Sequence, residues 1–222
     1  EQQEENNLPS TKIYEAFDGS THSIGCGSST EWKQILYRFT YFRKYRDIIE
    51  RGLCYARLIT KADEPLYNEL CPFLFYWIVH KIKENLEGDQ YIQATTTVHN
   101  LLQKLKPRWN CSKIYSSMGE HIFKKSKELF DYNYNWRVLT KQGGKNKYCC
   151  TANCRDSLRT AADAYRTLES VCGGDEGTPY CGEFNTKRNQ WNPKELPELN
   201  CYEEKQHKNC ITGAYLYQQL HK

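Results

Sequence analysis

The sequence predicts an all-α protein: a multi-helix bundle, braced by disulfides, with an irregular cysteine-rich loop toward its C-terminal end. Three observations predict this fold class. Apolar residues recur at helical spacing along most of the chain, with little strand-like alternation. The run from Cys71 to Ile82 is apolar and aromatic, and it holds no charge from Leu70 to Val79. Eleven cysteines scattered over 222 residues indicate an oxidising compartment and several disulfides.

The domain organisation follows from composition. Hydrophobic residues make up 39% of the chain and charged residues 26%, which is typical of a globular protein and excludes a disordered one. The polar residues 1–10 are expected to form a flexible segment, and residues 11–222 a single helical domain. An irregular, disulfide-rich loop is expected over about 173–201, where glycines, prolines and cysteines gather.

The first helices are predicted from capping and periodicity. Ser28 and Glu31 have the spacing of a capping box at a helix start, and Gly52 permits a break further on. Between them, one apolar face is expected to hold Ile35, Phe39, Phe42 and Ile49.

The next helix contains the run from Cys71 to Ile82. Asp63 and Pro65 resemble an N-cap followed by an early proline, and Pro72 is expected to delay or kink the helix, which runs to Leu86 and stops at Gly88. The uncharged run is shorter than the about 20 residues that span a bilayer. It is therefore predicted to be a helix buried on nearly all sides, at the centre of the core.

The second half of the chain shows the same periodicity. A stripe from Val98 to Leu105 ends at Pro107, and Ser117 with Glu120 forms a second capping box before a helix that ends at Gly143-Gly144. A further stripe consists of Leu158, Ala161, Ala162, Tyr165, Leu168 and Val171. A last short helix is expected over 211–220.

All the cysteines are disulfide candidates. They are Cys26, Cys54, Cys71, Cys111, Cys149, Cys150, Cys154, Cys172, Cys181, Cys201 and Cys210. Because their number is odd, at least one thiol is free or pairs outside the chain.

Geometry restricts the pairing. In one helix Cys154 and Cys172 would stand about 27 Å apart, which no disulfide bridges. A helix hairpin turning near residues 61–63 makes Cys54–Cys71 a candidate pair, with Cys26 competing for either partner. Cys201 and Cys210 are candidates for closing a short loop.

A metal site is the competing interpretation of the cysteines. Cys149, Cys150 and Cys154 lie close together, and His207 precedes Cys210 by three positions. No C-x-x-C pair occurs, however, and zinc sites usually show such tight pairs. Nor does the chain contain H-E-x-x-H, G-x-S-x-G or a Walker loop. We therefore expect no metal, no cofactor and no enzymatic activity.

The charge pattern bears on partners. The net charge is +4 and the pI about 8.4, with Lys and Glu interspersed, whereas nucleic-acid binders usually show a clustered basic face and a pI above about 9. The lysines 124, 125 and 127 are interpreted as a solvated helix face, and no nucleic-acid partner is expected. The 17 tyrosines suit a recognition surface, although AT-biased coding also enriches Tyr, Asn and Lys.

Several of these segments resemble a known family. Leu8-Pro9-Ser10-x-x-Ile13-Tyr14, the early Cys26 and the helix from Cys71 to Ile82 with its Tyr76-Trp77 pair resemble the Plasmodium interspersed repeat (PIR) proteins, called Vir in Plasmodium vivax. Lys147-Tyr148-Cys149 and the cysteine-rich stretch to Cys201 are similar to the end of that family's ectodomain. Pro72 and Phe75 depart from the usual helix, where Lys and Asp are commoner.

The resemblance implies a function. It implies the α-helical ectodomain of a variant surface antigen, exported to the surface of the infected red cell or reticulocyte, with roles in adhesion and immune evasion. The implied partners are a host cell-surface receptor, an antibody, or both, and the implied membrane anchor is a segment outside this chain. The alternatives are a cysteine/histidine metal-binding or enzymatic secreted domain, and an internal scaffold with reduced cysteines. The loop from Gly173 to Leu199 and the turn near Gly143 are the expected recognition surface.

Overall fold

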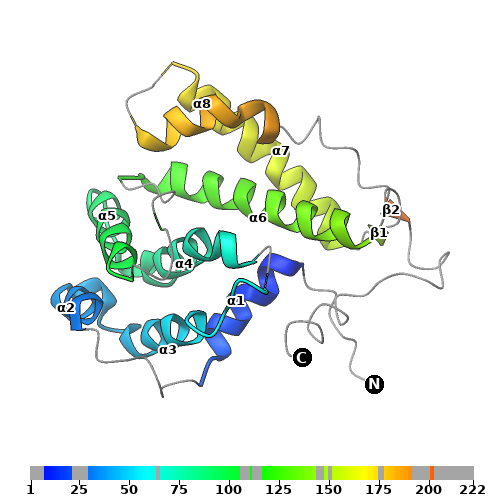
Figure 1. Ribbon diagram of the computed structural model, residues 1–222. Coiled ribbons are helices and arrows are strands. Elements are labelled where there is room, and N and C mark those ends of the chain that lie inside the picture. Colours follow the sequence, from blue (N-terminus) through cyan, green and yellow to red (C-terminus); the bar gives the residue numbers. More distant parts are fainter. Residues whose placement is uncertain are drawn as a thin grey trace. The chain divides into compact units, whose positions relative to one another are not determined.

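The structure, a computed structural model, is all-α, as predicted (Figure 1). It describes residues 8–21, 30–63, 66–105, 111, 117–143, 148–149, 152–174, 178–191 and 201–202. The helices are α1 (Pro9–Gly19), α2 (Thr30–Arg38), η1 (Thr40–Phe42), α3 (Arg46–Ala56), α4 (Leu66–Ile82), η2 (Lys83–Asn85), α5 (Gln90–Gln103), α6 (Glu120–Gly143), α7 (Ala152–Cys172) and α8 (Pro179–Trp191), where η marks a 3-10 helix. Two short strands, β1 (Tyr148–Cys149) and β2 (Cys201–Tyr202), pair in parallel. None of the described helices is long and apolar enough to cross a membrane.

The chain folds into two compact units. The α4 unit consists of Ile13–Phe123 with Thr178–Tyr180, and the α7 unit of Glu1–Lys12, Lys124–Gly177 and Cys181–Lys222. Helices α1 and α6 each contribute residues to both units. The single domain predicted for 11–222 stays a prediction.

Helix α1 begins at Pro9, inside the segment 1–10 for which flexibility was predicted. Ser10 is buried, its backbone N–H donates to Asn135 Oδ1 at 2.7 Å, and Asn135 Nδ2 donates to Ser10 Oγ at 2.9 Å. These hydrogen bonds to α6 hold the first turn of α1, and Pro9 suits its first helical position. Residues 9 and 10 are therefore helical, while residues 1–7 lie outside the described part of the chain.

Helix α4 is the core of its unit, which confirms the prediction for the Cys71–Ile82 run. Every residue from Phe73 to Val79 is buried, so the helix is covered on all sides over two turns. It packs against α3 and α5. Pro72 lies inside α4 and does not delay its start, because burial of the surrounding side chains outweighs the roughly 3 kcal/mol that an interior proline costs.

The end of α4 lies earlier than predicted. The α-helix stops at Ile82, tightens into η2, and gives way to extended backbone at Leu86 (φ −113°, ψ 134°). Gly88 then takes a positive φ of 50°, which favours glycine. Gly88 therefore marks the turn after η2 and does not end α4.

The apolar face predicted for the first long helix is wrong in register. Trp32 and Leu36 are the buried residues of α2, while Ile35 and Phe39 are only half-buried. Phe39 has extended backbone (φ −100°, ψ 136°), so the chain leaves the helix there. Because a helical period does not continue through an extended residue, Phe42 belongs to a separate turn.

The capping box predicted at Ser117 and Glu120 is also wrong. Ser117 has a φ of 64°, and α6 begins at Glu120, with the Gly119 carbonyl accepting from Phe123 N at 2.9 Å. Ser117 Oγ instead lies 3.3 Å from Thr96 Oγ1 on α5, so its side chain contacts a neighbouring helix. The predicted end of α6 at Gly143 is confirmed.

The irregular loop predicted for 173–201 contains helix α8. Pro179 occupies the first helical position, and Cys181 and Phe184 are fully buried. The Phe184 ring packs on Tyr165 of α7, with ring centroids 5.5 Å apart. Prolines and cysteines suggested a loop, but burial against α7 stabilises a helix here. Residues 192–200 and the helix predicted over 211–220 lie outside the described residues.

Candidate functional site

Two disulfides are defined within the described residues. Cys71 bonds to Cys111, with Cα atoms 5.3 Å apart, and Cys172 bonds to Cys181, with Cα atoms 4.9 Å apart. The candidate pair Cys54–Cys71 is therefore wrong. Cys54 is disulfide-bonded, but to none of these four cysteines.

The reason for the Cys71–Cys111 pairing is the packing of α5 on α4. The two helices are joined by the short η2 connection and lie against each other, so the chain after α5 returns toward the start of α4. Cys111 then falls beside Cys71, whereas the hairpin argument considered only the helices before and after residues 61–63.

Of the remaining cysteine predictions, one is confirmed and the others stay untested. Cys154 and Cys172 belong to one helix, and Cys172 bonds to Cys181, which confirms that Cys154 and Cys172 do not pair. The side chains of Cys26, Cys149, Cys150, Cys154, Cys201 and Cys210, and that of His207, lie outside the described residues. The Cys201–Cys210 bond and the metal alternative therefore stay untested. Among the described residues, no group of three His, Cys, Asp or Glu side chains is placed to hold a metal ion.

The predicted recognition loop from Gly173 to Leu199 is in large part a fixed helix. The Cys172–Cys181 bond ties α8 to the end of α7, and Asn185 Nδ2 donates to the Cys172 carbonyl at 2.8 Å. Residues 175–177, 192–199 and, at the other predicted site, 144–147 lie outside the described residues. The part that the structure describes is thus a rigid helical surface.

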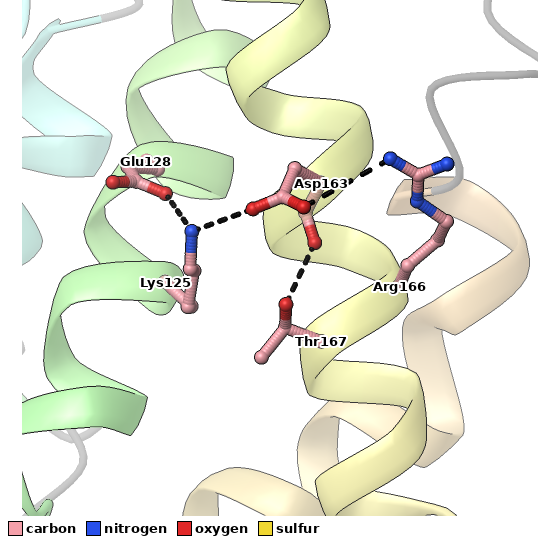
Figure 2. Close-up of polar contacts among 5 residues, drawn as sticks. All are labelled: Lys125, Glu128, Asp163, Arg166 and Thr167. Carbon is pink, nitrogen blue, oxygen red and sulfur yellow. Dashed lines mark hydrogen bonds and ion pairs between the residues drawn. The ribbon is translucent and has the colours of Figure 1, made fainter.

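Two of the three lysines clustered on α6 are ion-paired. Lys125 Nζ lies 3.1 Å from Glu128 Oε2 and 2.8 Å from Asp163 Oδ2 on α7, and Figure 2 shows it between the two carboxylates. The Lys125 ammonium lowers the pKa of Asp163, and its hydrogen bond with Asp163 raises the pKa of Lys125. Lys127 pairs with Asp131 at 2.6 Å. Lys125 is thus a bridge between two helices, which the interpretation as a solvated face did not foresee.

A second group of cations has a different environment. Residues 37–46, here called the basic–aromatic segment, read Tyr-Arg-Phe-Thr-Tyr-Phe-Arg-Lys-Tyr-Arg and contain no acid. They run from the last turn of α2 through η1 to the first residue of α3. The near balance of 31 cations and 27 acids over the whole chain conceals this segment. The signal was the absence of any acid between Glu31 and Asp47.

The two ends of the basic–aromatic segment are clamped together. Arg46 Nη2 donates to the Tyr37 carbonyl at 2.9 Å, and Arg46 Nε donates to the Leu36 carbonyl at 3.3 Å. The guanidinium also lies 4.9 Å from the Tyr37 ring centroid. Arg46 therefore satisfies carbonyls at the C-terminal end of α2, as a cation placed there should. In between, Phe42 is fully buried and anchors the turn.

A shallow depression of 590 Å³ opens beside this segment in the α4 unit. The segment contributes Thr40, Tyr41, Arg43 and Lys44 to its lining, and Asn85 and Gln90 complete it. Burial raises the pKa of Tyr41, and a hydrogen bond with Tyr45 raises the pKa of the exposed Lys44. The depression is thus lined by hydroxyls, amides and two cations, which suits binding of a polar, negatively charged ligand.

Fold and disulfides together define a class: an all-α, disulfide-braced domain built around a tryptophan-containing core helix. The chain matches the family model of the Plasmodium vivax Vir protein over residues 8–217 and belongs to that family, as its resemblance to PIR proteins implied. Membership indicates a variant antigen of Plasmodium. No curated protein and no solved structure matches the chain.

Proposed function

We propose that this Vir protein is displayed on the surface of the infected red cell or reticulocyte, where it adheres to a host cell-surface receptor and evades antibodies. It acts by binding and not by catalysis. The observation that carries the proposal is the separation of a fixed core from exposed surface. Helix α4 is buried on all sides, while the exposed residues of the basic–aromatic segment and of α8 stand on elements that are clamped or disulfide-bonded.

This separation suits antigenic variation. Exposed substitutions away from special contacts usually change the free energy of unfolding by no more than about 0.5 kcal/mol, whereas truncating a buried aromatic residue costs about 3–5 kcal/mol. Surface residues in contact with a receptor or an antibody can therefore change among family members while the α4 core keeps the fold. Loops and helix faces on such a scaffold are where recognition residues concentrate.

The test is binding of the folded chain to host cells. We expect the oxidised protein to bind reticulocytes or endothelial cells and to be recognised by antibodies from exposed hosts, and the reduced and alkylated protein to lose both. If neither host cells nor immune antibodies distinguish the two forms, the proposal is wrong.

A further inference from the structure

We propose that the basic–aromatic segment, residues 37–46, binds a sulfated linear polysaccharide of the kind that cell-surface proteoglycans carry. This inference rests on the proposed function, because it names the chemistry of the host surface that the protein recognises. It is carried by the placement of cations, aromatic rings and the polar depression on one clamped segment.

The first step is the excess of positive charge. Arg38, Arg43 and Lys44 are exposed, and within the described residues none of them forms an ion pair with a carboxylate. Arg38 lies over the Phe39 ring at 5.7 Å and Lys44 over the Tyr45 ring at 5.1 Å. A ring face attracts a cation without neutralising it, so these charges stay available to an anion.

Of the carboxylates near the segment, two are paired elsewhere, while Asp47, directly after the segment, is exposed. Glu31 pairs with Lys104 at 3.4 Å, and Glu50 pairs with Lys33, so both are engaged by lysines outside the segment. Glu84 is near enough to contribute a minor attraction to Lys44. The α6 lysines 125 and 127 differ from the cations of the segment, because each has a carboxylate oxygen within 3.1 Å.

The second step is the fit to a sugar chain. Tyr37 is 52% exposed, and its ring offers a flat surface on which the C–H face of a sugar ring can pack. The adjoining depression presents the Thr40 hydroxyl and the Asn85 and Gln90 amides, which can hydrogen-bond to sugar hydroxyls. The Arg46 clamp holds the segment in one conformation, which lowers the entropy lost on binding.

Two observations favour a sulfated polysaccharide over nucleic acid and over an anionic membrane surface. Disulfides such as Cys71–Cys111 indicate a compartment outside the cytosol, where sulfated polysaccharides are abundant and nucleic acid is not. Binding to a bilayer surface requires apolar side chains that insert, yet the large aliphatic residues that are exposed in the described part of the chain, Leu58, Ile92 and Val171, all lie outside the segment. A chain of regularly spaced sulfates is the anion that best matches several exposed cations along one segment.

The experiment compares two charge-matched triple variants of the whole chain, with disulfides intact. The test variant is R38Q/R43Q/K44Q. The control is K124Q/R159Q/R188Q, which removes two arginines and one lysine that are also exposed, in the α7 unit; of these, Arg159 pairs with Asp156 at 2.8 Å. Both lower the net charge from +4 to +1, since 31 cations become 28 against 27 acids. Far-ultraviolet circular dichroism and thermal melting check that both fold.

Binding to immobilised heparin is measured against salt. We expect the test variant to bind at least about 10-fold more weakly, with a shallower salt dependence, and the control to stay within about 2-fold of the unchanged protein. Desulfated heparin should bind none of the three proteins: not the unchanged protein, not the test variant and not the control. Equal loss in both variants, equal binding of desulfated heparin, or tighter binding of single-stranded RNA or of phosphatidylserine vesicles would each overturn the inference.

A cell experiment separates this inference from the proposed function. Host cells treated with heparinase should lose binding of the unchanged protein to the level of the test variant. If binding to treated cells persists in full, the polysaccharide inference fails while the adhesin proposal stands. If untreated cells bind neither protein although heparin does, the adhesin proposal fails alone.

Discussion

Substituting Gly52 by alanine is expected to destabilise the protein, although glycine is a poor residue in the middle of a helix. Gly52 lies inside α3 and is buried against the indole of Trp77 on α4. A Cβ atom at this position would stand 2.7 Å from Trp77 Cζ3 and closer still to Cη2, nearer than real side chains pack. The glycine that was predicted to permit a break thus permits a close approach of two helices.

The indole has little freedom to move away. Trp77 is 2% exposed, its Nε1 donates to Asp18 Oδ1 at 2.9 Å, and its ring packs on Phe17 with centroids 5.3 Å apart. Asp18 is itself held by Lys81 at 2.7 Å. Shifting the ring would therefore disturb a hydrogen bond, an ion pair and an aromatic contact together.

The expected change in the free energy of unfolding follows from two opposing effects. Alanine gains about 1 kcal/mol over glycine in helix propensity, and overpacking a tight core costs about 1–3 kcal/mol. Because a distance of 2.7 Å calls for the upper part of that range, we expect Gly52→Ala to lower the free energy of unfolding by about 1–2 kcal/mol. For a chain of this length the melting temperature should fall by roughly 2–8 °C.

The assay is a double-mutant cycle followed by urea unfolding with the disulfides intact. Trp77→Phe removes the benzo ring of the indole, whose atoms lie closest to the added Cβ. In that background Gly52→Ala should become neutral or stabilising, by up to about 1 kcal/mol. Gly182→Ala on α8 is the control, since nothing lies within 4 Å of a Cβ there. A stabilising Gly52→Ala in the unchanged protein, with no coupling to Trp77, would refute the reasoning.

Two further predictions concern the cross-links of each unit. Replacing Cys71 and Cys111 by serine opens a loop with a sequence separation of 40, so the free energy of unfolding should fall by about 4 kcal/mol from loop entropy, as measured by denaturant midpoint. Since Lys125 lowers the pKa of Asp163, the stabilising effect of that carboxylate is present above its ordinary value of 3.8 and is lost as the pH falls through the lowered value. Asp163→Asn should therefore unfold at lower urea than the unchanged protein at pH 7, with the difference shrinking toward pH 3, and a difference independent of pH would contradict this.

The cysteines show where sequence reasoning stops. Spacing along a single helix sufficed to exclude Cys154–Cys172, because the rise per residue of a helix is fixed. It did not suffice to find the partner of Cys71, because that depends on how α5 returns along α4. Likewise, prolines and cysteines near residue 179 concealed α8, whose burial against α7 was not visible in the local pattern.

The candidate binding surface was within reach of the sequence but was not recognised there. The absence of acids from residues 37–46 is visible in the sequence, yet the only basic cluster considered there was that of the α6 lysines. Only the structure shows that Lys125 is held between Glu128 and Asp163, while Arg38 and Arg43 form no ion pair within the described residues. The sequence shows which side chains are charged, but only the folded structure shows which of these charges are ion-paired.

The sequence by itself determined that this Vir protein is helical, that the uncharged run around Tyr76-Trp77 is its buried core helix, and which family it belongs to. These conclusions hold because helical periodicity and apolar runs are local properties. The tertiary structure alone decided that Cys71 pairs with Cys111 and that Gly52 receives the Trp77 ring. Both depend on distances between residues far apart in the chain, which are set by the packing of one helix on another and leave no periodic trace in the sequence.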